Sequence, residues 1–454
     1  MPSSDRVTHI VTDSERPGQK LGLLMCIALV MGNMIGSGVF LLPTDLAPLG
    51  WNAALGWLVT IAGTLCLALV FARLARHFPG GCGAYTYAAE AFGPATGFIV
   101  AWSFWISCWV TNATLAVAAV RNLAIIYPSL NDGGSAAALL AIAFVWFFTL
   151  VNLLGVRKAG GMQVVTLVLK LLLLLGAISI GLWWLTAGDG ALPSMEGAKP
   201  VSVTSVGQAA TFTLFALLGF ESALAAGDRI ADPERNVPRA TTIGMIATGL
   251  LYLLACTAVT MLVPLPILTE SIAPFPTFFS HFIGPEAGIA AAALAAIAAL
   301  GALNGFVLLA GELPRDLAHR GLISRSFGVE NRHGVPHWSL LLSALLATLI
   351  VYANYSRGLA ELFNFMMLVT TSTTIIFYLV GSLAALKFRH AKRVPMSAGF
   401  ILLTVAGIVY VCWAFYGAGI EPSLYSLAMT LAGLPLFLIA SRSAPARREE
   451  APVA

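Results

Sequence analysis

The sequence predicts an all-α membrane protein with about twelve transmembrane helices, and two observations lead to this class. Of the 454 residues, 58% are hydrophobic and only 10% are charged, whereas soluble domains carry about 25% charged residues. The apolar residues also occur in runs as long as a helix needs to cross the hydrocarbon core of a bilayer, about 20 residues. A soluble globule of this composition would expose much apolar surface to water, so we expect the bilayer to be its solvent.

Turn-forming residues divide the apolar sequence into twelve candidate spans. In chain order they cover residues 21–46, 51–75, 94–123, 136–156, 162–184, 205–226, 237–262, 284–309, 338–353, 363–385, 397–416 and 424–440. Residues 1–20 are polar and lack the apolar region of a signal peptide. We therefore expect a cytoplasmic tail over residues 1–20, one transmembrane domain over residues 21–441, and a second cytoplasmic tail over residues 442–454.

The basic residues predict how the spans are oriented, because Lys and Arg are retained on the cytoplasmic side. With twelve spans and the N-terminus inside, 21 of the 25 Lys and Arg residues lie in cytoplasmic segments. The exceptions are Arg121, Lys199 and Arg357, which lie outside, and Lys170, which lies within a span. This asymmetry favours an even number of spans, with both termini in the cytoplasm.

The first span contains a glycine-rich interruption, in which Gly36 and Gly38 flank Ser37. Paired glycines favour a kink or an unwound turn, and unwinding in a bilayer is tolerated only where the freed backbone groups line a cavity or bind something. Freed N–H groups and the positive end of the next half-helix suit a carboxylate, and Ser37 would add a hydroxyl donor. The alternative is close helix packing through small residues.

The sixth span carries a carboxylate, Glu221, two residues after Gly219. A charged group within a span is costly and is by default a functional hypothesis. Glu221 would be a proton carrier, a gate residue or a counter-charge for a cation; a neutral, hydrogen-bonded Glu is the structural alternative. Freed carbonyls near Phe215 and Leu218 would suit an ammonium group.

Two interrupted spans that lie five spans apart are the pattern of inverted repeats. This pattern predicts a first repeat over residues 21–187, a second repeat over residues 205–388, and two extra helices over residues 396–441.

The fifth span contains Lys170 in a run otherwise made of leucine and valine. A lysine at this depth must find an anion or backbone carbonyls, or lose its proton. It would occupy the place of a sodium ion or relay protons. Snorkelling to the membrane surface is the alternative, which the central position disfavours.

Two further patterns within the spans are weaker indications of a binding site. Phe104, Cys108, Asn112 and Leu115 fall on one face of the third span by i, i+4 spacing, and residues 370–374 form a run of hydroxyl side chains. The sequence shows no nucleophile elbow, phosphate loop or metal-ligand spacing. We therefore expect no enzyme activity, cofactor or metal. The basic residues lie in short runs between spans, so we expect no nucleic-acid partner either.

These motifs resemble those of the amino acid–polyamine–organocation superfamily, and most closely its bacterial basic amino acid/polyamine antiporters. The resemblance covers nearly the whole chain, from Leu21 to the last span. The stretches that carry it are residues 32–43, 83–87 with 92–94, 219–222 and 232–241.

The resemblance implies a leucine-transporter-like fold, in which two inverted five-helix repeats are followed by two extra helices, often at a homodimer interface. It implies alternating access around a site at the membrane midplane. There the substrate carboxylate meets Ser37 and the amide of Gly38, and the ammonium meets carbonyls near Met34, Phe215 and Leu218. The implied substrate-binding residues are Asn33, Met34, Ile35, Gly36, Ser37, Gly38, Cys108, Asn112, Phe215, Ala216, Leu218, Phe306 and Thr374. The implied gate or proton-coupling residues are Phe104, Glu221 and Lys170.

The resemblance also implies a function and a location. The expected activity is exchange of a cationic amino acid for its decarboxylated amine, such as arginine for agmatine, across the inner membrane of a bacterium. The expected partners are this amino acid or amine, membrane lipid, and a second copy of the chain in a homodimer.

Three departures from the family pattern keep other activities open. Phe215 and Phe306 stand where the antiporters have tryptophan, the best cation–π partner, and Phe104 stands in the place of a tyrosine of the extracellular gate. Lys170 is a residue type found there in transporters of neutral amino acids. Proton-coupled import or exchange of neutral amino acids is therefore the alternative function. A channel is a distant one, because no continuous polar pore is visible.

Overall fold

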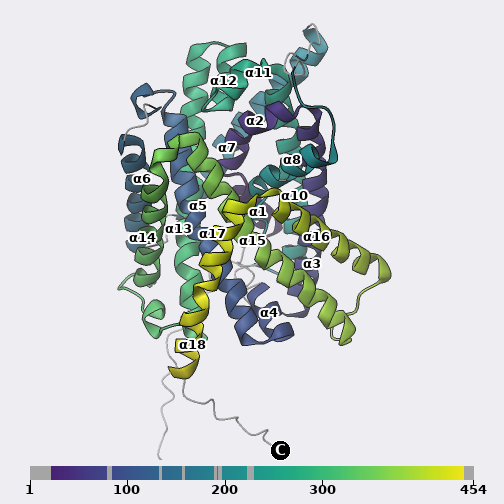
Figure 1. The fold of residues 1–454 in the computed structure, drawn as a ribbon, viewed down its shortest axis with the longest axis vertical. Helices are drawn as coiled ribbons and strands as arrows, with labels where there is room; N and C mark the ends of the chain where they lie inside the picture. The colour runs from purple at the N-terminus through teal and green to yellow at the C-terminus, as the bar shows by residue number, and fades with distance from the viewer. Residues whose placement is uncertain are drawn as a thin grey trace, which may run out of the picture.

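The computed structural model describes residues 22–78, 84–131, 135–155, 159–188, 192, 197–221 and 230–443. The predicted N-terminal tail, and the C-terminal tail beyond Ser443, lie outside the described residues. Helices occupy all twelve predicted spans over the part that the structure describes. The expected all-α class is therefore confirmed (Figure 1).

The helices fall into three groups by length and place. The long ones are α3 (Trp51–His77), α5 (Pro94–Leu123), α6 (Ser135–Leu153), α7 (Ala159–Ala187), α10 (Pro233–Leu262), α13 (Pro285–His319), α14 (His337–Asn354), α15 (Gly358–His390) and α16 (Ala398–Gly417). Shorter helices on the remaining predicted spans are α1 (Leu23–Met34), α2 (Gly38–Leu46), α8 (Val203–Ala216), α17 (Ile420–Leu431) and α18 (Gly433–Ser443). Three more lie between spans and were not predicted: α4 (Ala84–Phe92), α11 (Leu265–Thr269) and α12 (Pro274–Phe282).

Length and composition give a lower count of membrane spans than the sequence predicts. Nine helical stretches of the described chain are long and apolar enough to cross a membrane, and the bent pair α1–α2 makes a tenth. One of the nine, His337–His390, contains both α14 and α15. The 14-residue α8 does not reach the required length, and residues 222–226 of its predicted span lie outside the described part. Twelve spans and the inverted repeat stay predictions.

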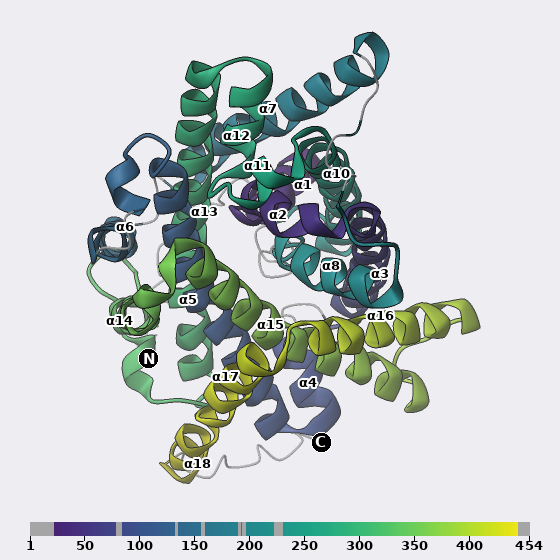
Figure 2. The same ribbon diagram turned by 45° about the horizontal axis from the view of Figure 1, so that its top comes forward.

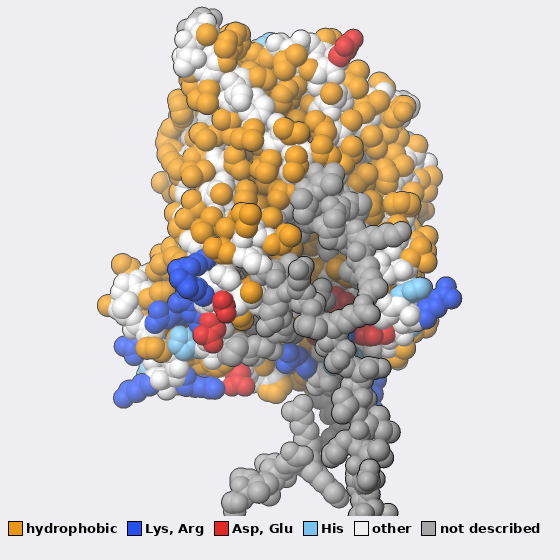
Figure 3. Space-filling view, turned by 180° about the vertical axis from the view of Figure 1, so that it is seen from behind, with side chains coloured by type: hydrophobic (Ala, Val, Ile, Leu, Met, Phe, Trp, Pro, Cys, Tyr) orange, Lys and Arg blue, Asp and Glu red, His pale blue; other side chains and the backbone are white. Residues whose placement is uncertain are grey.

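The molecular surface separates into an apolar band and one charged end. Figure 3 shows hydrophobic side chains over most of the visible face, and Lys and Arg gathered at the end that also carries α4 in Figure 1. We call this end the basic end; its residues include Arg73, Arg76, Arg315, Arg320, Lys387 and Arg389. The opposite end carries α2, α11 and α12 (Figure 1). Such a band is what lipid contact requires, and the protein is a multi-pass membrane protein.

Helix α5 forms the axis of the bundle. Its apolar window is buried throughout, and both α13 and α15 pack along it. Trp105 of α5 donates from Nε1 to the carbonyl of Ala310 on α13 and to the hydroxyl of Ser343 on α14, both at 3.0 Å. In Figure 2, α6, α13 and α14 lie on one side of the molecule, and α1, α2, α3, α8 and α10 on the other. The interrupted helices α1 and α8 pack chiefly on α10 and α3, respectively.

Candidate binding site at two helix breaks

The predicted break in the first span is present in the structure. Helix α1 ends at Met34 and α2 begins at Gly38, and their axes are bent by 46°. The amide of Gly36 donates to the carbonyl of Met34 at 2.7 Å in a tight turn instead of continuing the helix. The last carbonyls of α1 therefore lose their usual partners four residues ahead.

Two side chains from other helices bind the open end of α1. Lys170 of α7 donates from Nζ to the carbonyl of Gly32 at 3.1 Å, and Tyr252 of α10 donates from its hydroxyl to the carbonyl of Met34 at 2.8 Å. The Lys170 side chain is 1% exposed. A helix C-terminus carries partial negative charge, so the ammonium of Lys170 caps α1 where the chain breaks. The carbonyl of Met34 was expected to hold a substrate ammonium, but it already accepts from Tyr252 and Gly36.

The second break begins where α8 ends, at Ala216, and directly touches the first. Gly219 has a backbone φ of +109°, a conformation that only glycine adopts readily. A Cβ atom at Gly219 would lie 3.0 Å from the backbone C and O atoms of Asn33. Glycine is therefore required here twice, by its φ angle and by the close approach of the two breaks.

The carboxylate of Glu221 satisfies polar groups at the second break. Its Oε2 accepts from the amide of Gly219 at 3.2 Å and from the hydroxyl of Tyr378 on α15 at 3.0 Å. Lys170 and Glu221 thus have equivalent contacts. Lys170 bonds to a backbone carbonyl at the first break, and Glu221 bonds to a backbone amide at the second. Residues 222–229, which follow this turn, lie outside the described part of the chain.

A small cavity lies between the two breaks; we call it the central cavity. Most of the predicted site residues line it. These are Asn33, Met34, Gly36, Ser37, Gly38, Phe104, Phe215, Ala216, Leu218, Glu221, Phe306 and Thr374. The structure adds four residues that were not in the predicted site: Ser107, Thr111, Leu115 and Thr370. The elements that meet here are the α1–α2 break, α5, the end of α8, α13 and α15.

Two hydroxyl groups of the central cavity lack a hydrogen-bond partner within the described chain. They are Ser37 Oγ and Thr370 Oγ1, and both side chains are 1% exposed. By contrast, the hydroxyl of Thr374 donates to the carbonyl of Thr370 at 2.9 Å. A buried hydroxyl without a partner costs about 1–3 kcal/mol, so Ser37 and Thr370 are suited to bond with a bound molecule.

Four predicted site residues do not line the central cavity: Ile35, Cys108, Asn112 and Lys170. Their substrate-binding or coupling roles stay predictions. Ser107 and Thr111 line the cavity in the places expected of Cys108 and Asn112, which are buried elsewhere in the packing. One residue turns a helix by about 100°. Both sets fit helical spacing, and only the packing of α5 against α13 and α15 decides which faces the cavity.

An aromatic layer separates the central cavity from the basic end. Phe377 of α15 stacks on Phe104 of α5 with ring centroids 4.6 Å apart, and on Phe71 of α3 at 5.4 Å. We call these three rings the aromatic cover. The resemblance placed Phe104 at an extracellular gate; in the structure its ring lies between the central cavity and the basic end. The gate role of Phe104 stays a prediction.

A polar layer closes the opposite side. Arg121, near the end of α5, donates from Nε to the carbonyl of Ile272 at 3.0 Å, and Asn364 of α15 donates to Asp45 Oδ1 of α2 at 2.8 Å. Asp45 and Arg121 are near enough for their opposite charges to interact. We call Asp45, Arg121 and Asn364 the polar cover. The Arg121 guanidinium lies 5.3 Å from the Phe363 ring.

The charge of the central cavity comes from one residue. Among the described residues that line it, Glu221 alone has an ionisable acidic or basic side chain. No group of three His, Cys, Asp or Glu residues within the described chain could hold a metal ion. The site can therefore offer one carboxylate, unpartnered hydroxyls, the N-terminus of α2 and three phenylalanine rings to a small molecule.

The sequence is similar to those of known proteins over almost its whole length. The model of the amino acid permease family matches residues 21–436. The cadaverine/lysine antiporter of Escherichia coli K12 is 30% identical over 405 residues, which are 88% of this chain and 90% of that protein. The putrescine transporter PotE of the same strain is 28% identical over 434 residues, covering 94% and 98%. PotE of Haemophilus influenzae is 28% identical over 420 residues, covering 92% and 96%.

Proposed function

The chain belongs to the amino acid permease family, and we propose that it exchanges a cationic amino acid for its decarboxylated amine by alternating access. The observation that carries this proposal is Glu221, the one acidic or basic side chain among the described residues of the central cavity. A carboxylate in a site of low dielectric favours a bound cation over a neutral molecule. The relatives that are named for lysine, cadaverine and putrescine support the same class of substrate.

The two breaks bind different groups of the substrate. The substrate carboxylate binds at the N-terminus of α2, where the first amides of the helix and the unpartnered hydroxyl of Ser37 are available. The ammonium groups bind near Glu221 and the rings of Phe104, Phe215 and Phe306, which add cation–π attraction. A diamine has no carboxylate and uses only the contacts for ammonium groups, so both exchange partners fit the same cavity.

Lys170 and Glu221 have separate roles in this proposal. Lys170 lies outside the cavity and keeps the end of α1 open by bonding to Gly32. Glu221 lines the cavity and bonds to Tyr378 on α15. It is therefore the group that can sense the substrate and couple its presence to movement of α15.

We also infer the location of the protein. The basic end faces the cytoplasm of a bacterium, since Lys and Arg are retained there, and both termini lie on that side of the inner membrane. The aromatic cover then closes the central cavity toward the cytoplasm and the polar cover closes it toward the outside. A homodimer stays a prediction.

Exchange in proteoliposomes tests the proposed function. Vesicles are loaded with lysine, cadaverine, arginine, putrescine, alanine or buffer, and uptake of labelled lysine is measured. We expect uptake only with a cationic amino acid or diamine inside. Uptake into empty vesicles under an inward proton gradient, with alanine competing as well as lysine, would overturn exchange in favour of proton-coupled neutral import.

A glycine variant checks that the central cavity is the site. In Gly38→Val, the added Cβ would lie 2.8 Å from Cδ1 of Phe215 and would fill the space at the N-terminus of α2. We expect lysine binding to be lost. The matched control is Gly399→Val at the exposed start of α16, where a Cβ meets nothing within 4 Å. Unchanged lysine affinity in Gly38→Val would place the substrate elsewhere.

A further inference from the structure

Helix α13 carries one ring of the central cavity, Phe306, next to a stretch of small residues. Alanine and glycine make up most of residues 288–305, which lead up to this ring. Small side chains let helices approach closely, but their ridges and grooves are shallow. Apolar packing alone therefore leaves the rotation of α13 about its own axis weakly determined.

A pair of buried asparagines supplies the missing constraint. Asn152 of α6 donates from Nδ2 to Oδ1 of Asn304 on α13 at 2.9 Å, and the two side chains are 2% and 4% exposed. The same Nδ2 donates to the carbonyl of Phe148 within α6 at 2.8 Å, which orients the Asn152 amide. A rotation of α13 that moved Asn304 away from α6 would take this donor from a buried oxygen, which is costly. A buried asparagine can fix the register of packed helices in this way.

Asn304 and Phe306 lie on opposite faces of α13, because two residues turn an α-helix by about 200°. Holding Asn304 against α6 therefore directs Phe306 to the central cavity, which it lines. On another face, α13 comes close to α7, since a Cβ atom at Gly301 would lie 2.7 Å from Cγ2 of Thr166. The contacts with α6 and α7 together leave one orientation for the Phe306 ring.

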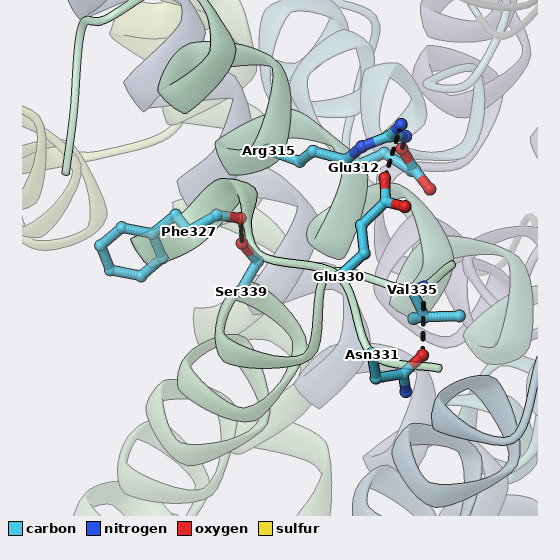
Figure 4. Close-up of polar contacts among 7 residues, drawn as sticks. All are labelled: Glu312, Arg315, Phe327, Glu330, Asn331, Val335 and Ser339. Atoms are coloured by element: carbon cyan, nitrogen blue, oxygen red, sulfur yellow. Dashed lines mark hydrogen bonds and ion pairs between the residues drawn. The ribbon is translucent and has the colours of Figure 1, made fainter. Parts of the chain in front are cut away.

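The basic end of α13 is tied to the same neighbouring helices. Figure 4 shows Arg315 of α13 between Glu312 and Glu330, with N–O distances of 2.5 and 2.8 Å. Asn331, in the α13–α14 connection, donates from Nδ2 to the carbonyl of Leu153 at the end of α6, at 2.9 Å. Helix α13 and the connection that follows it are thus bonded to α6 at two levels.

We propose that Asn304 is a positioning residue of the binding site, which holds the Phe306 ring where a substrate ammonium binds. This inference rests on the proposed function, in which the rings of the central cavity attract a cation. Asn304 does not line the cavity, so it acts on affinity through the rotation of α13 that its bond to Asn152 fixes. A ring that turns away from the ammonium loses its cation–π attraction.

A double-mutant cycle on substrate affinity tests the proposal. Inhibition constants of lysine and cadaverine are measured for exchange of labelled lysine in proteoliposomes with wild type, Asn304→Leu, Phe306→Ala and the double variant. We expect Asn304→Leu to weaken both substrates about fivefold, the size of one cation–π contact. With Phe306→Ala already present, Asn304→Leu should weaken them by about twofold or less, because the ring through which Asn304 acts is gone. An equal loss in both backgrounds, or no loss in either, would overturn the proposal.

Two further variants separate positioning from general loosening of the bundle. Trp146→Phe removes another hydrogen bond of α6, from Nε1 to the hydroxyl of Thr348 on α14 at 3.0 Å. It should lower the melting temperature as Asn304→Leu does, but leave both affinities unchanged; a fivefold loss here would also overturn the proposal. Asn152→Leu breaks the asparagine pair from α6, leaves the sequence of α13 intact, and should reproduce the affinity loss. Failure of the wild type to exchange lysine for cadaverine would instead overturn the proposed function.

Discussion

The two covers of the central cavity are built from different chemistry. The aromatic cover joins Phe71, Phe104 and Phe377 through ring stacking, whereas the polar cover joins Asp45, Arg121 and Asn364 to neighbouring elements through hydrogen bonds and charge. Stacked rings keep much of their contact when they slide, but a hydrogen bond is lost once its geometry fails. One side can therefore open by small ring movements, whereas the other must break defined bonds.

The largest effect is expected from the centre of the aromatic cover. Phe377→Ala removes the ring that stacks on both Phe71 and Phe104, and a buried Phe-to-Ala change costs about 3–5 kcal/mol. It would also weaken the aromatic cover on the side of the basic end, so substrate should leak from vesicles without a counter-substrate. Thermal unfolding in detergent and efflux into substrate-free buffer measure the two effects. The control is Phe147→Ala, on a lipid-facing side chain that is 57% exposed. Tight vesicles with Phe377→Ala would contradict the role of the cover.

Breaking the polar cover should cost less free energy of unfolding than Phe377→Ala, but should change transport at one face of the membrane only. Arg121→Gln loses the charged bond to Ile272 and the contact with the Phe363 ring, about 2–3 kcal/mol together. We expect a lower melting temperature and a changed KM at the outer face only. Arg357→Gln is the control, because partly exposed Arg357 has the same kinds of contact at the surface: its guanidinium pairs with Glu421 and lies 4.5 Å from the Phe365 ring. Exposed ion pairs contribute about 1 kcal/mol or less. If Arg121→Gln and Arg357→Gln lowered the melting temperature equally, the contacts of buried Arg121 would stabilise the protein no more than those of a surface arginine.

Glu221 lies beside the aromatic cover and should have a modest effect on stability. In Glu221→Gln, the amide oxygen can still accept from Gly219 and Tyr378, so we expect a loss of about 1 kcal/mol. If Glu221 carries a proton, exchange measured across a pH series should lose its pH dependence. Glu286→Gln in the first turn of α13 should keep the wild-type profile. An unchanged profile in Glu221→Gln would return this residue to a structural role.

Much of the fold could be predicted because lipid imposes a simple rule on the sequence. Each predicted span contains a helix wherever the structure describes it, and the pair Gly36 and Gly38 marked the first break. The rule fails for α4, α11 and α12, which have 9, 5 and 9 residues. They are too short to span a bilayer, so the length of their apolar runs gives no signal.

The site was predictable where backbone breaks mark it and not where packing decides. The face of α5 that lines the cavity could not be chosen from the sequence, because helical spacing allows Ser107 and Thr111 as readily as Cys108 and Asn112. Lys170 was recognisable as a costly charge, but its partner Gly32 lies 138 residues away along the chain. From the sequence, Arg121 was assigned only to a segment outside the membrane. Its side chain is 1% exposed in the structure, and no neighbouring residue in the sequence indicates this burial.

The smallest effect is expected from adding a polar group to the aromatic cover. Phe104→Tyr places a hydroxyl on the ring that borders the central cavity on the side of the basic end, next to a lining that includes Glu221. A new hydrogen bond to that carboxylate would give the aromatic cover the kind of bond that holds the polar cover, at a net gain of about 1 kcal/mol or less. Breaking it on each transport cycle should slow exchange by about fivefold or less.

Turnover of lysine exchange at saturating substrate measures this change. Phe306→Tyr is the matched control, because Phe306 lines the central cavity but is not part of the aromatic cover, and a hydroxyl there would not hold the cover shut. Slowing confined to Phe104→Tyr would mean that ring sliding sets the ease with which the basic side opens. Unchanged turnover would mean that the cover opens by moving whole helices, in which case the two covers differ in composition but not in how they open.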